Sequence, residues 1–403
     1  MTVDYLIIGG GILGQAVAWT LSKAAPSADI ALIEKGLCSQ ATTSQAAALV
    51  TQGRSKLIAA SMVQDTLSAI TELNSELDMP IPFNRCGGLH LAVSTDEIKS
   101  LNNMASIAGE LKIDHEFLEQ AIVDQYCPFF NTLNSQSRLY FSGDGYVDGT
   151  ILANSFGMSA RTNGVKFLQG ENITAITPLG GSYQVSRSSD VTDTTAKHLI
   201  ICAGPWAAKL LKPLGISLPV TSMRSLYWIT EPYSKLTADF PVCVVPSAQA
   251  YFRQEINHML FGVRDKGQAV HPDDVPCDVH GFQFNNDQQG LEALENAWPK
   301  LTQFWPDIEQ LGLANLITGI SSYSADGLPV IGCPVSHTNL TIVSGCSGAG
   351  IAYSAGIAKH AVDHATTGNI HNELDINRFN SGDAYSEKFR NDCLMARSQK
   401  TAG

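Results

Sequence analysis

The sequence predicts an α/β protein of two domains. A strand, a glycine-rich turn, a helix and a second strand follow one another within the first 34 residues. Residues 216–308 alternate short β-like runs with polar loops. The length of 403 residues is typical of two domains, each with its own core.

The composition excludes several classes of protein. Hydrophobic residues make up 44% of the chain and charged residues 16%, which argues against intrinsic disorder. The chain has 26 Lys and Arg against 38 Asp and Glu, a formal charge of −12. Because nucleic-acid binding requires a basic surface, we expect no nucleic-acid partner.

The cysteines and the start of the chain bear on the compartment. Nine cysteines without any CxxC pair fit neither a disulfide framework nor a structural zinc site, so we expect no metal. The first residues carry no basic region of a secretory signal. No apolar run reaches the roughly 18 residues that a membrane span requires. We therefore expect a cytoplasmic protein without a membrane span.

The elements at the start of the chain have clear signals. Residues 3–8 combine β-branched and aromatic residues, which predicts a buried strand. Residues 15–23 carry apolar residues at helical spacing, and Pro26 and Ser27 end this helix. Residues 30–33 predict a second strand, which ends at Glu34.

Similar patterns continue along the chain, without an internal repeat or a low-complexity tract. Helices are predicted over 57–77, 95–111, 151–163 and 288–298. A Ser/Thr cap followed by acidic residues marks the start of the second of these helices. Strands are predicted over 87–93, 165–168, 173–176, 198–202, 227–229, 250–252 and 258–263. The polar tail after residue 374 is expected to wrap the surface.

The glycine-rich turn predicts a dinucleotide site. Gly9, Gly11 and Gly14 have GxGxxG spacing between a strand and a helix, and Glu34 follows Gly14 by 20 residues. In this motif the first glycine permits a tight turn, the second admits a pyrophosphate and the third allows close helix packing. The helix start at Ile12 and Leu13 then meets the phosphates. An acid at position 34 favours an unphosphorylated ribose over NADP.

Two later segments favour FAD over NAD as the dinucleotide. Residues 203–206, Ala-Gly-Pro-Trp, follow the predicted strand at 198–202 and predict a second close approach of backbone to a cofactor. Residues 344–351 are rich in glycine and small residues and lead into a predicted helix over 352–362. A second helix entrance of this kind predicts a second anion site. Two such entrances far apart in the sequence indicate one long ligand such as FAD.

Motifs along nearly the whole chain resemble those of one protein family. They are GGGILG at 9–14, ATTSQAAALV at 41–50, GYVDGTILANSF at 145–156, CAGPWAAKL at 202–210, YFRQE at 251–255, DGLPVIG at 326–332, GCSGAGIAYSAG at 345–356 and LDINRF at 374–379. In this order they resemble the D-amino-acid oxidase-like flavoprotein superfamily, which contains glycine, sarcosine and D-amino-acid oxidases and dehydrogenases.

The resemblance implies a division of the chain into two domains. A discontinuous, Rossmann-like FAD-binding domain takes residues 1–80, 145–215 and 312–373. An α+β substrate domain, with a mainly antiparallel sheet that covers the flavin, takes residues 81–144 and 216–311. Residues 374–403 form a C-terminal tail.

The resemblance also implies where FAD is bound. Thr43 and Ser44 are expected at the pyrophosphate, Ala47 to Leu49 under the flavin, and Ile173 at the adenine. The full expected set is Gly9, Gly11, Ile12, Leu13, Gly14, Glu34, Lys35, Thr42, Thr43, Ser44, Ala47, Ala48, Leu49, Ile173, Ala203, Gly204, Trp206, Gly319, Gly348, Ala349, Gly350 and Ile351. Members that bind flavin covalently use Cys or His at positions where this chain has Gly319 and Thr42. We therefore expect non-covalent FAD.

The chain departs from the family pattern at the substrate site. Many members carry an arginine that clamps a substrate carboxylate where this chain has Ser321. As a replacement anchor we expect Arg253, together with Tyr251, on a strand that covers the flavin, and we expect Tyr323 to line the same pocket.

The resemblance implies oxidation of a C–N bond in a small amine or amino acid, with hydride transfer to flavin N5. The absent arginine leaves two alternatives open. The substrate could be a side chain of a partner protein, during maturation of a protein-derived quinone cofactor. The chain could also be a flavin-bound subunit of a heteromeric dehydrogenase. The sequence makes no prediction about the oligomeric state.

Overall fold

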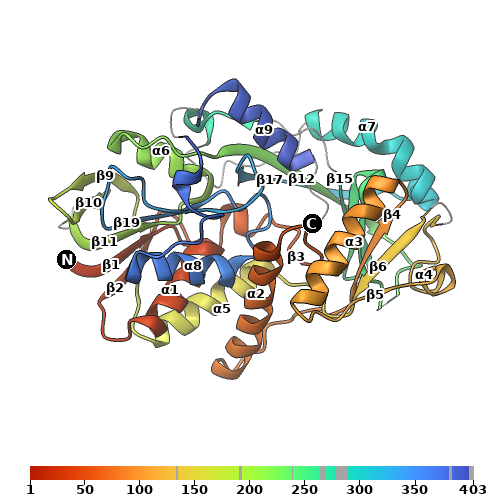
Figure 1. Ribbon diagram of the computed structural model, residues 1–403, viewed down its shortest axis with the longest axis horizontal. Coiled ribbons are helices and arrows are strands. Elements are labelled where there is room, and N and C mark those ends of the chain that lie inside the picture. Colours follow the sequence, from red (N-terminus) through yellow and green to blue (C-terminus); the bar gives the residue numbers. More distant parts are fainter. Residues whose placement is uncertain are drawn as a thin grey trace.

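The computed structural model describes residues 1–132, 135–189, 193–237, 239–263, 269–276, 288–380 and 384–398. Two sheets lie side by side along the long axis of the molecule (Figure 1). The N-terminal strands belong to the first sheet, and the second sheet lies at the opposite end (Figure 1). The predicted fold class is confirmed: a parallel α/β unit is joined to a unit with a mainly antiparallel sheet.

The first sheet has a parallel centre in the order β19-β11-β1-β2-β8. Its central strands are buried on both faces because helices and a hairpin cover them, so they read as continuous apolar runs. The bounds are β1 Thr2–Ile8, β2 Ile30–Glu34, β8 Lys166–Gln169, β9 Ile173–Pro178, β10 Tyr183–Arg187, β11 Thr194–Ile201, β18 Val330–Gly332 and β19 Leu340–Ser344. Strand β18 pairs antiparallel with β19, and the β9–β10 hairpin pairs with β11.

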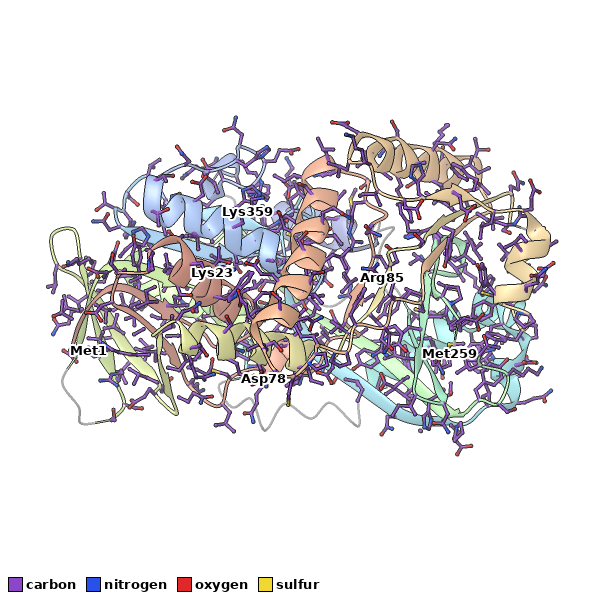
Figure 2. All side chains as sticks on the ribbon, turned by 90° about the horizontal axis from the view of Figure 1, so that it is seen from below. Met1, Lys23, Asp78, Arg85, Met259 and Lys359 are labelled. Carbon is purple, nitrogen blue, oxygen red and sulfur yellow. The ribbon has the colours of Figure 1, made fainter. Side chains whose placement is uncertain are left out.

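Helices pack together on one side of this sheet (Figure 1). They are α1 Ile12–Ala24, α2 Leu57–Glu76, α5 Gly149–Thr162 and α8 Ser354–Thr367. Helix α1 is buried over most of its surface because α5 and α8 flank it. Lys359 Nζ lies 2.9 Å from Asp65 Oδ1, which links α8 to α2. Figure 2 shows Lys359 and Lys23 on this helical side, while Met259 lies in the other half of the molecule.

The second sheet runs β16-β12-β15-β14-β13-β4-β6-β5, with β17 paired to β12. Its bounds are β4 Gly88–Ala92, β5 Glu116–Phe117, β6 Ser137–Phe141, β12 Thr221–Pro232, β13 Val242–Val245, β14 Ala250–Glu255, β15 His258–Val263, β16 Ala269–Val270 and β17 Leu313–Tyr323. An aromatic core that includes Trp228, Phe252, Phe261 and Trp305 fills the space beside it. The helices of this half are α3 Thr95–Glu110, α4 Gln120–Tyr126 and α7 Gln288–Phe304.

Short elements complete the chain. Strands β3 Leu49–Val50 and β7 Gly145–Tyr146 pair with each other. Helix α6 Ala207–Leu211 follows β11, and α9 Glu387–Ser398 ends the described chain. The 3₁₀ turns are η1 Ala41–Thr43, η2 Gly204–Trp206, η3 Lys212–Leu214, η4 Pro246–Ala248, η5 Pro272–Asp274, η6 Pro306–Gln310 and η7 Ile376–Arg378.

Most predicted elements are confirmed, but several differ in their bounds: α7 continues to Phe304 rather than ending at 298, and β12 begins at Thr221 rather than 227. The Ser94 cap of α3 is a full capping box, because Ser94 Oγ accepts from Glu97 N and Glu97 Oε2 accepts from Ser94 N. The first helix begins at Ile12 rather than 15, because the glycine turn leads directly into it. The last small-residue helix begins at Ser354 rather than 352, because residues 345–353 form turns.

The expected domain limits remain a prediction, but one segment differs from them in its sheet. Residues 312–323 are expected with the FAD-binding segments, whereas β17 pairs antiparallel with β12 from Leu313 to Tyr323. This long pairing extends the second sheet up to the glycine-rich loop, where Tyr323 forms a bridge with Cys346. Strand β17 therefore links the second sheet to the glycine-rich loop that follows β19 of the first sheet.

The C-terminal segment is attached by an ion pair and by apolar packing. Arg378 donates from Nε to Asp326 Oδ2 at 2.9 Å and from Nη2 to Asp326 Oδ1 at 3.0 Å. Burial alone would raise the pKa of Asp326, but the bond and charge of Arg378 lower it overall.

No described helix is long and apolar enough to cross a membrane.

A histidine pair inside the first half predicts acid sensitivity. His198 Nε2 and His364 Nδ1 each lie 2.8 Å from Thr341 Oγ1. Burial, and then the charge of His364, lower the pKa of His198 to about 4, and burial lowers the pKa of His364. The folded state keeps His198 neutral, whereas the unfolded chain takes up the proton below its usual pKa of about 6.5.

The free energy of unfolding should therefore fall as the pH decreases from about 6.5 towards 4. Urea titrations of wild type and His198→Gln across this interval measure the slope, which should be shallower in the variant. His337→Gln, at a partly exposed site beside Ser336, is the control and should keep the wild-type slope. Equal slopes for wild type and His198→Gln would contradict the assignment.

Candidate functional site

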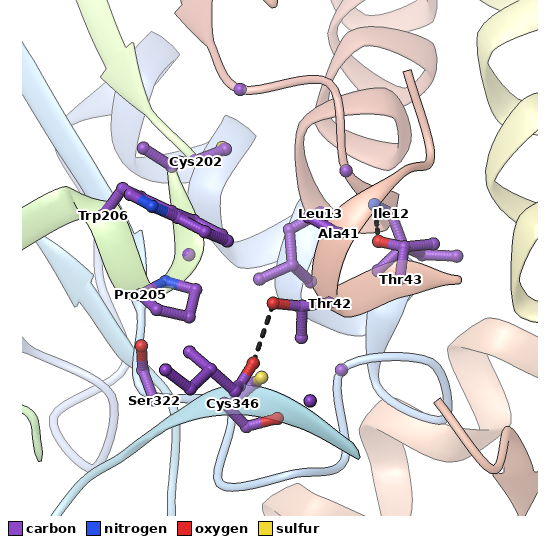
Figure 3. Close-up of a pocket in the computed structure, with 18 of the residues that line it drawn as sticks. Ile12, Leu13, Ala41, Thr42, Thr43, Cys202, Pro205, Trp206, Ser322 and Cys346 are labelled. Carbon is purple, nitrogen blue, oxygen red and sulfur yellow. Dashed lines mark hydrogen bonds between the residues drawn. The ribbon is translucent and has the colours of Figure 1, made fainter. Parts of the chain in front are cut away.

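One elongated cavity of about 910 Å³ runs from the first sheet to the second. At one end it is lined by Glu34, Lys35 and residues 171–176. Its middle passes residues 41–49 and 202–206 (Figure 3). At the other end its walls come from β12, β14, β17 and the loop at 344–352. The cavity therefore joins the predicted dinucleotide turn to the second sheet.

The glycine turn has the geometry that its spacing predicts. Gly9 has φ +109°, and a Cβ there would lie 2.5 Å from the carbonyl oxygen of Cys202. A Cβ on Gly14 would overlap the carbonyl oxygen of Gly9. Gly11 lines the cavity directly before α1. The three glycines thus close the turn, expose the backbone and seat the helix, as expected.

Thr43 completes the start of α1. The N-cap residue Gly11 has no side chain to accept a hydrogen bond, and Thr43 Oγ1 instead accepts from Ile12 N at 3.0 Å (Figure 3). The neighbouring Thr42 Oγ1 donates to Ile320 O of β17 at 2.8 Å. These two bonds fix turn η1 between the helix start and the second sheet. The helix start faces the cavity, where its dipole favours an anion.

The carboxylate of Glu34 is fixed at the edge of the same turn. Its two oxygens accept from Gly10 N at 2.6 Å and from Gly36 N at 2.8 Å. A carboxylate has about four acceptor positions, so the bonded oxygens can also accept from ribose hydroxyls. Glu34 lines the cavity beside Lys35. This arrangement fits the acceptor that an unphosphorylated ribose requires.

The second glycine-rich loop meets the segment at 46–49 at the far end of the cavity. Gly348, Ala349, Gly350 and Ile351 all line it, and Cys346 lies close by (Figure 3). Opposite, Ala48 has φ +57°, a left-handed conformation that presents its backbone to the cavity. Small residues from both segments line this end, which leaves room for a planar ring system.

Tyrosines and a serine from the second sheet cover this end. Tyr227, Tyr251 and Tyr323 line the cavity together with Ser225, whose Oγ lies 3.3 Å from Tyr323 Oη. Burial raises the pKa of Tyr227 to about 12, so its phenol is neutral at physiological pH. The cover is thus lined by hydroxyl groups from four side chains.

The structure brings most of the predicted site residues together. The residues of the expected set that line the cavity are Gly9, Gly11, Ile12, Leu13, Glu34, Lys35, Thr42, Thr43, Ala47, Ala48, Leu49, Ile173, Ala203, Gly204, Trp206, Gly319, Gly348, Ala349, Gly350, Ile351, Tyr251 and Tyr323. Gly14, Ser44 and Arg253 are not among the lining residues that the structure describes. Gly14 supports the turn from behind, and Ser44 is exposed, with Oγ donating to Ala41 O.

Arg253 is placed differently from the expected substrate anchor. Its Nε donates to Ala47 O at 2.7 Å, and its Nη1 donates to Gln254 O and pairs with Glu255 at 2.6 Å. Its guanidinium also lies over the ring of Tyr146. Arg253 therefore supports the segment at 46–49 from outside the cavity, because its charge and donors are used on the protein itself.

Some lining residues were missed from the sequence. Gln45 and Lys209 line the cavity, and so does Arg397 of α9, from the tail that was expected to wrap the surface. A signal for Arg397 was present: Phe389, Cys393 and Arg397 recur every four residues, which places them on one helix face. All three are buried in the structure.

His360 and His364 lie one turn apart on α8, a spacing that some metal sites use, but both side chains have other contacts. His364 contacts Thr341, and the ring of His360 contacts that of His371. The described parts of the chain contain no group of three or more His, Cys, Asp or Glu residues arranged to hold a metal ion.

The start of α1, a second glycine-rich loop, a fixed carboxylate between glycines and an end covered by the second sheet define a cavity for a long dinucleotide such as FAD. A family model described as "DAO: FAD dependent oxidoreductase" matches residues 4–364. The chain belongs to this family of FAD-dependent oxidoreductases.

Individual relatives agree with this assignment. Human mitochondrial dimethylglycine dehydrogenase is 24% identical over 389 residues, covering 93% of this chain and 44% of that protein. The chain thus spans a little under half the length of this relative. The crystal structure of L-proline dehydrogenase from P. horikoshii superposes with a TM-score of 0.81 at 17% identity, covering 94% of this chain and 98% of that one. Glycine oxidase from Geobacillus kaustophilus gives 0.75 at 20% identity, covering 94% and 99%.

The bond between Thr43 and Ile12 gives a matched test. Thr43→Val should lower the free energy of unfolding by about 1 kcal/mol, because it removes the side-chain acceptor at a helix start. It should also weaken FAD binding, because the helix start faces the cavity. Ser44→Ala changes the adjacent, exposed hydroxyl and should leave both quantities unchanged. Chemical denaturation and FAD titration of the apoprotein measure them, and equal effects of the two variants would contradict this role.

Proposed function

We propose that this protein is an FAD-dependent oxidoreductase that oxidises the C–N bond of a small amine or amino acid. The single observation that carries the proposal is the continuity of the cavity, which reaches from the dinucleotide turn to the tyrosine cover of the second sheet. A substrate at the covered end would lie between the second sheet and the loop at 344–352. The names of the relatives, which act on dimethylglycine, proline and glycine, support this substrate class.

When bound, FAD supplies the two-electron acceptor, at flavin N5. FAD held there would accept a hydride from the carbon next to the substrate nitrogen, and water would hydrolyse the imine that remains. The chain itself contributes orientation and a sheltered site. Ser225 and the three tyrosines provide hydrogen-bonding groups at the covered end, and small residues at 46–49 and 348–351 also line the cavity.

We further propose that the FAD is held without a covalent bond. Gly319 has no side chain, and the Thr42 hydroxyl is engaged with Ile320 O. Neither position offers the Cys or His that a covalent link would need. Acid precipitation of the loaded protein should release all of the yellow colour into the supernatant. Colour that remains in the pellet would contradict non-covalent binding.

The activity is tested by mixing FAD-loaded protein anaerobically with glycine, sarcosine, dimethylglycine and L-proline. At least one of these amines should bleach the oxidised flavin spectrum, and an imine or aldehyde product should appear in equal amount. Protein that binds FAD but is reduced by none of a wide amine panel would contradict the proposal. Reduction only after addition of a partner protein would instead favour the alternative of a protein side chain as substrate.

A further inference from the structure

A second cavity lies beside the glycine-rich loop, apart from the cavity that fits FAD. Its volume is about 490 Å³, and its walls come from the start of α2, the turn after β17, the glycine-rich loop and α9. Ala349 lines both cavities, so the loop forms a wall between them. The proposed function makes no use of this second space.

Arg54 brings a guanidinium without a hydrogen-bond partner to this cavity. The residue is 3% exposed, and none of its Nε, Nη1 and Nη2 atoms makes a hydrogen bond within the described parts of the chain. Its Cζ lies 5.1 Å from the centre of the Tyr353 ring, whose face attracts a cation but accepts no conventional hydrogen bond. Burial of a charged group without hydrogen bonds costs free energy. The donors of Arg54 are therefore free to bind a ligand that supplies acceptors.

The charges around Arg54 leave an excess of positive charge. Lys56 also lines the cavity, and its Nζ donates to Asp326 O at 3.0 Å. The carboxylate of Asp326 is balanced by Arg378, which bonds to both of its oxygens. Asp392, a partly exposed residue of α9, is the other carboxylate among the described lining residues. Together these five side chains carry one positive charge more than they carry negative charges.

The start of α2 adds a second feature that favours an anion. Residues 54–56 lead into this helix and line the cavity, as does Ala59 in its first turn. The N-cap residue Lys56 makes no side-chain cap bond, and the first turn contains no acidic residue. The positive end of the dipole of a 20-residue helix therefore meets the cavity. This contribution is independent of the guanidinium of Arg54.

We propose that the second cavity binds a small oxyanion, whose phosphate or carboxylate head group accepts hydrogen bonds from Arg54. A guanidinium offers several donors in one plane, which suits both head groups. The site is separate from the covered end of the first cavity, where a substrate would lie. Residues 54–56 continue the segment at 46–49 through β3, and Ser347 belongs to the glycine-rich loop. A bound oxyanion thus stabilises, from outside, two segments that line the FAD cavity.

The test uses the FAD-loaded protein, with sodium phosphate and sodium acetate as separate probes at an ionic strength fixed with sodium chloride. Calorimetric titration measures the Kd of each probe for wild type, Arg54→Met and Arg54→Lys. Arg85→Met, at an exposed position that lines neither cavity, is the matched control. Asp392→Asn removes the carboxylate on the wall formed by α9. Thermal unfolding of each protein with and without the probe measures stability.

We expect at least one probe to bind wild type saturably, and this probe identifies the head group. Arg54→Met should raise its Kd about 10- to 100-fold, because charge-assisted hydrogen bonds are lost. Arg54→Lys should recover part of the affinity, Arg85→Met should match wild type, and Asp392→Asn should bind more tightly. Without a probe, Arg54→Met should be at least as stable as wild type, since it removes a buried charge without hydrogen bonds. A saturating probe should raise the Tm of wild type but not that of Arg54→Met.

Two results would overturn the site. The first is that neither probe binds wild type. The second is that a probe binds wild type and Arg54→Met with the same Kd, because the anion would then lie elsewhere on the protein. If Arg54→Met also unfolds at a lower temperature without a probe, Arg54 serves only to support Tyr353. Weaker binding by Asp392→Asn would likewise contradict an anion in this cavity.

Discussion

Gly14→Val should yield protein that no longer retains FAD and that unfolds more readily. Any Cβ at position 14 overlaps the carbonyl oxygen of Gly9, which is backbone and cannot rotate away. The helix would have to move from the turn, at a cost of about 3 kcal/mol by comparison with overpacked cores. The same movement withdraws the amide groups of Ile12 and Leu13 from the cavity. Flavin content after purification and urea unfolding measure the two effects.

Gly109→Ala is the control for this variant. Gly109 also lies in a helix, α3, but a Cβ there would meet nothing within 4 Å. Alanine should therefore stabilise the protein slightly, by about 0.5–1 kcal/mol, and leave the flavin content unchanged. A Gly14→Val protein with full flavin content would show that the cavity binds its ligand in another way.

Glu34→Leu should raise the Kd of FAD about 100-fold. The substitution removes acceptors for the ribose hydroxyls, and hydrogen bonds to a charged group contribute about 1.5–3 kcal/mol each. It also leaves Gly10 N and Gly36 N without their acceptor, which should destabilise the turn itself. Titration of the apoprotein with FAD measures the affinity, and chemical denaturation measures the stability.

Glu34→Gln separates the loss of acceptors for the ribose from the loss of acceptors for the backbone amides of the turn. A glutamine keeps one acceptor oxygen but presents an NH₂ group to the second backbone amide, so its effect should be intermediate. Glu110→Gln, at an exposed position of α3, changes the net charge equally and should have no effect on the affinity. Equal FAD affinity for wild type and Glu34→Leu would exclude Glu34 as the ribose acceptor.

The dinucleotide turn could be predicted from the sequence because its parts are close neighbours in the chain. Gly9, Gly11 and Gly14 act through turn geometry and helix packing, and these follow from local spacing. Glu34 ends the next parallel strand, whose pairing with β1 brings it back to the turn. Thr43 was expected near the pyrophosphate, but only the structure shows that it accepts from Ile12 N.

The substrate end was harder to predict because its residues come from distant parts of the chain. Arg253 and Arg397 are both buried arginines that contact segments far away in the sequence. Their residue type and local pattern are similar. Which one reaches the cavity depends on the position of β14 beneath the segment at 46–49 and on the packing of α9 across β12 and β17.

The amino-acid sequence alone determined the α/β class, the FAD family and the glycine turn, since short-range spacing and apolar periodicity specify these features. Tertiary packing alone decided that Arg397, and not Arg253, lines the covered end of the cavity, and that β17 joins the two sheets. A charge is placed by the elements that surround it, and those elements meet only when the chain has folded.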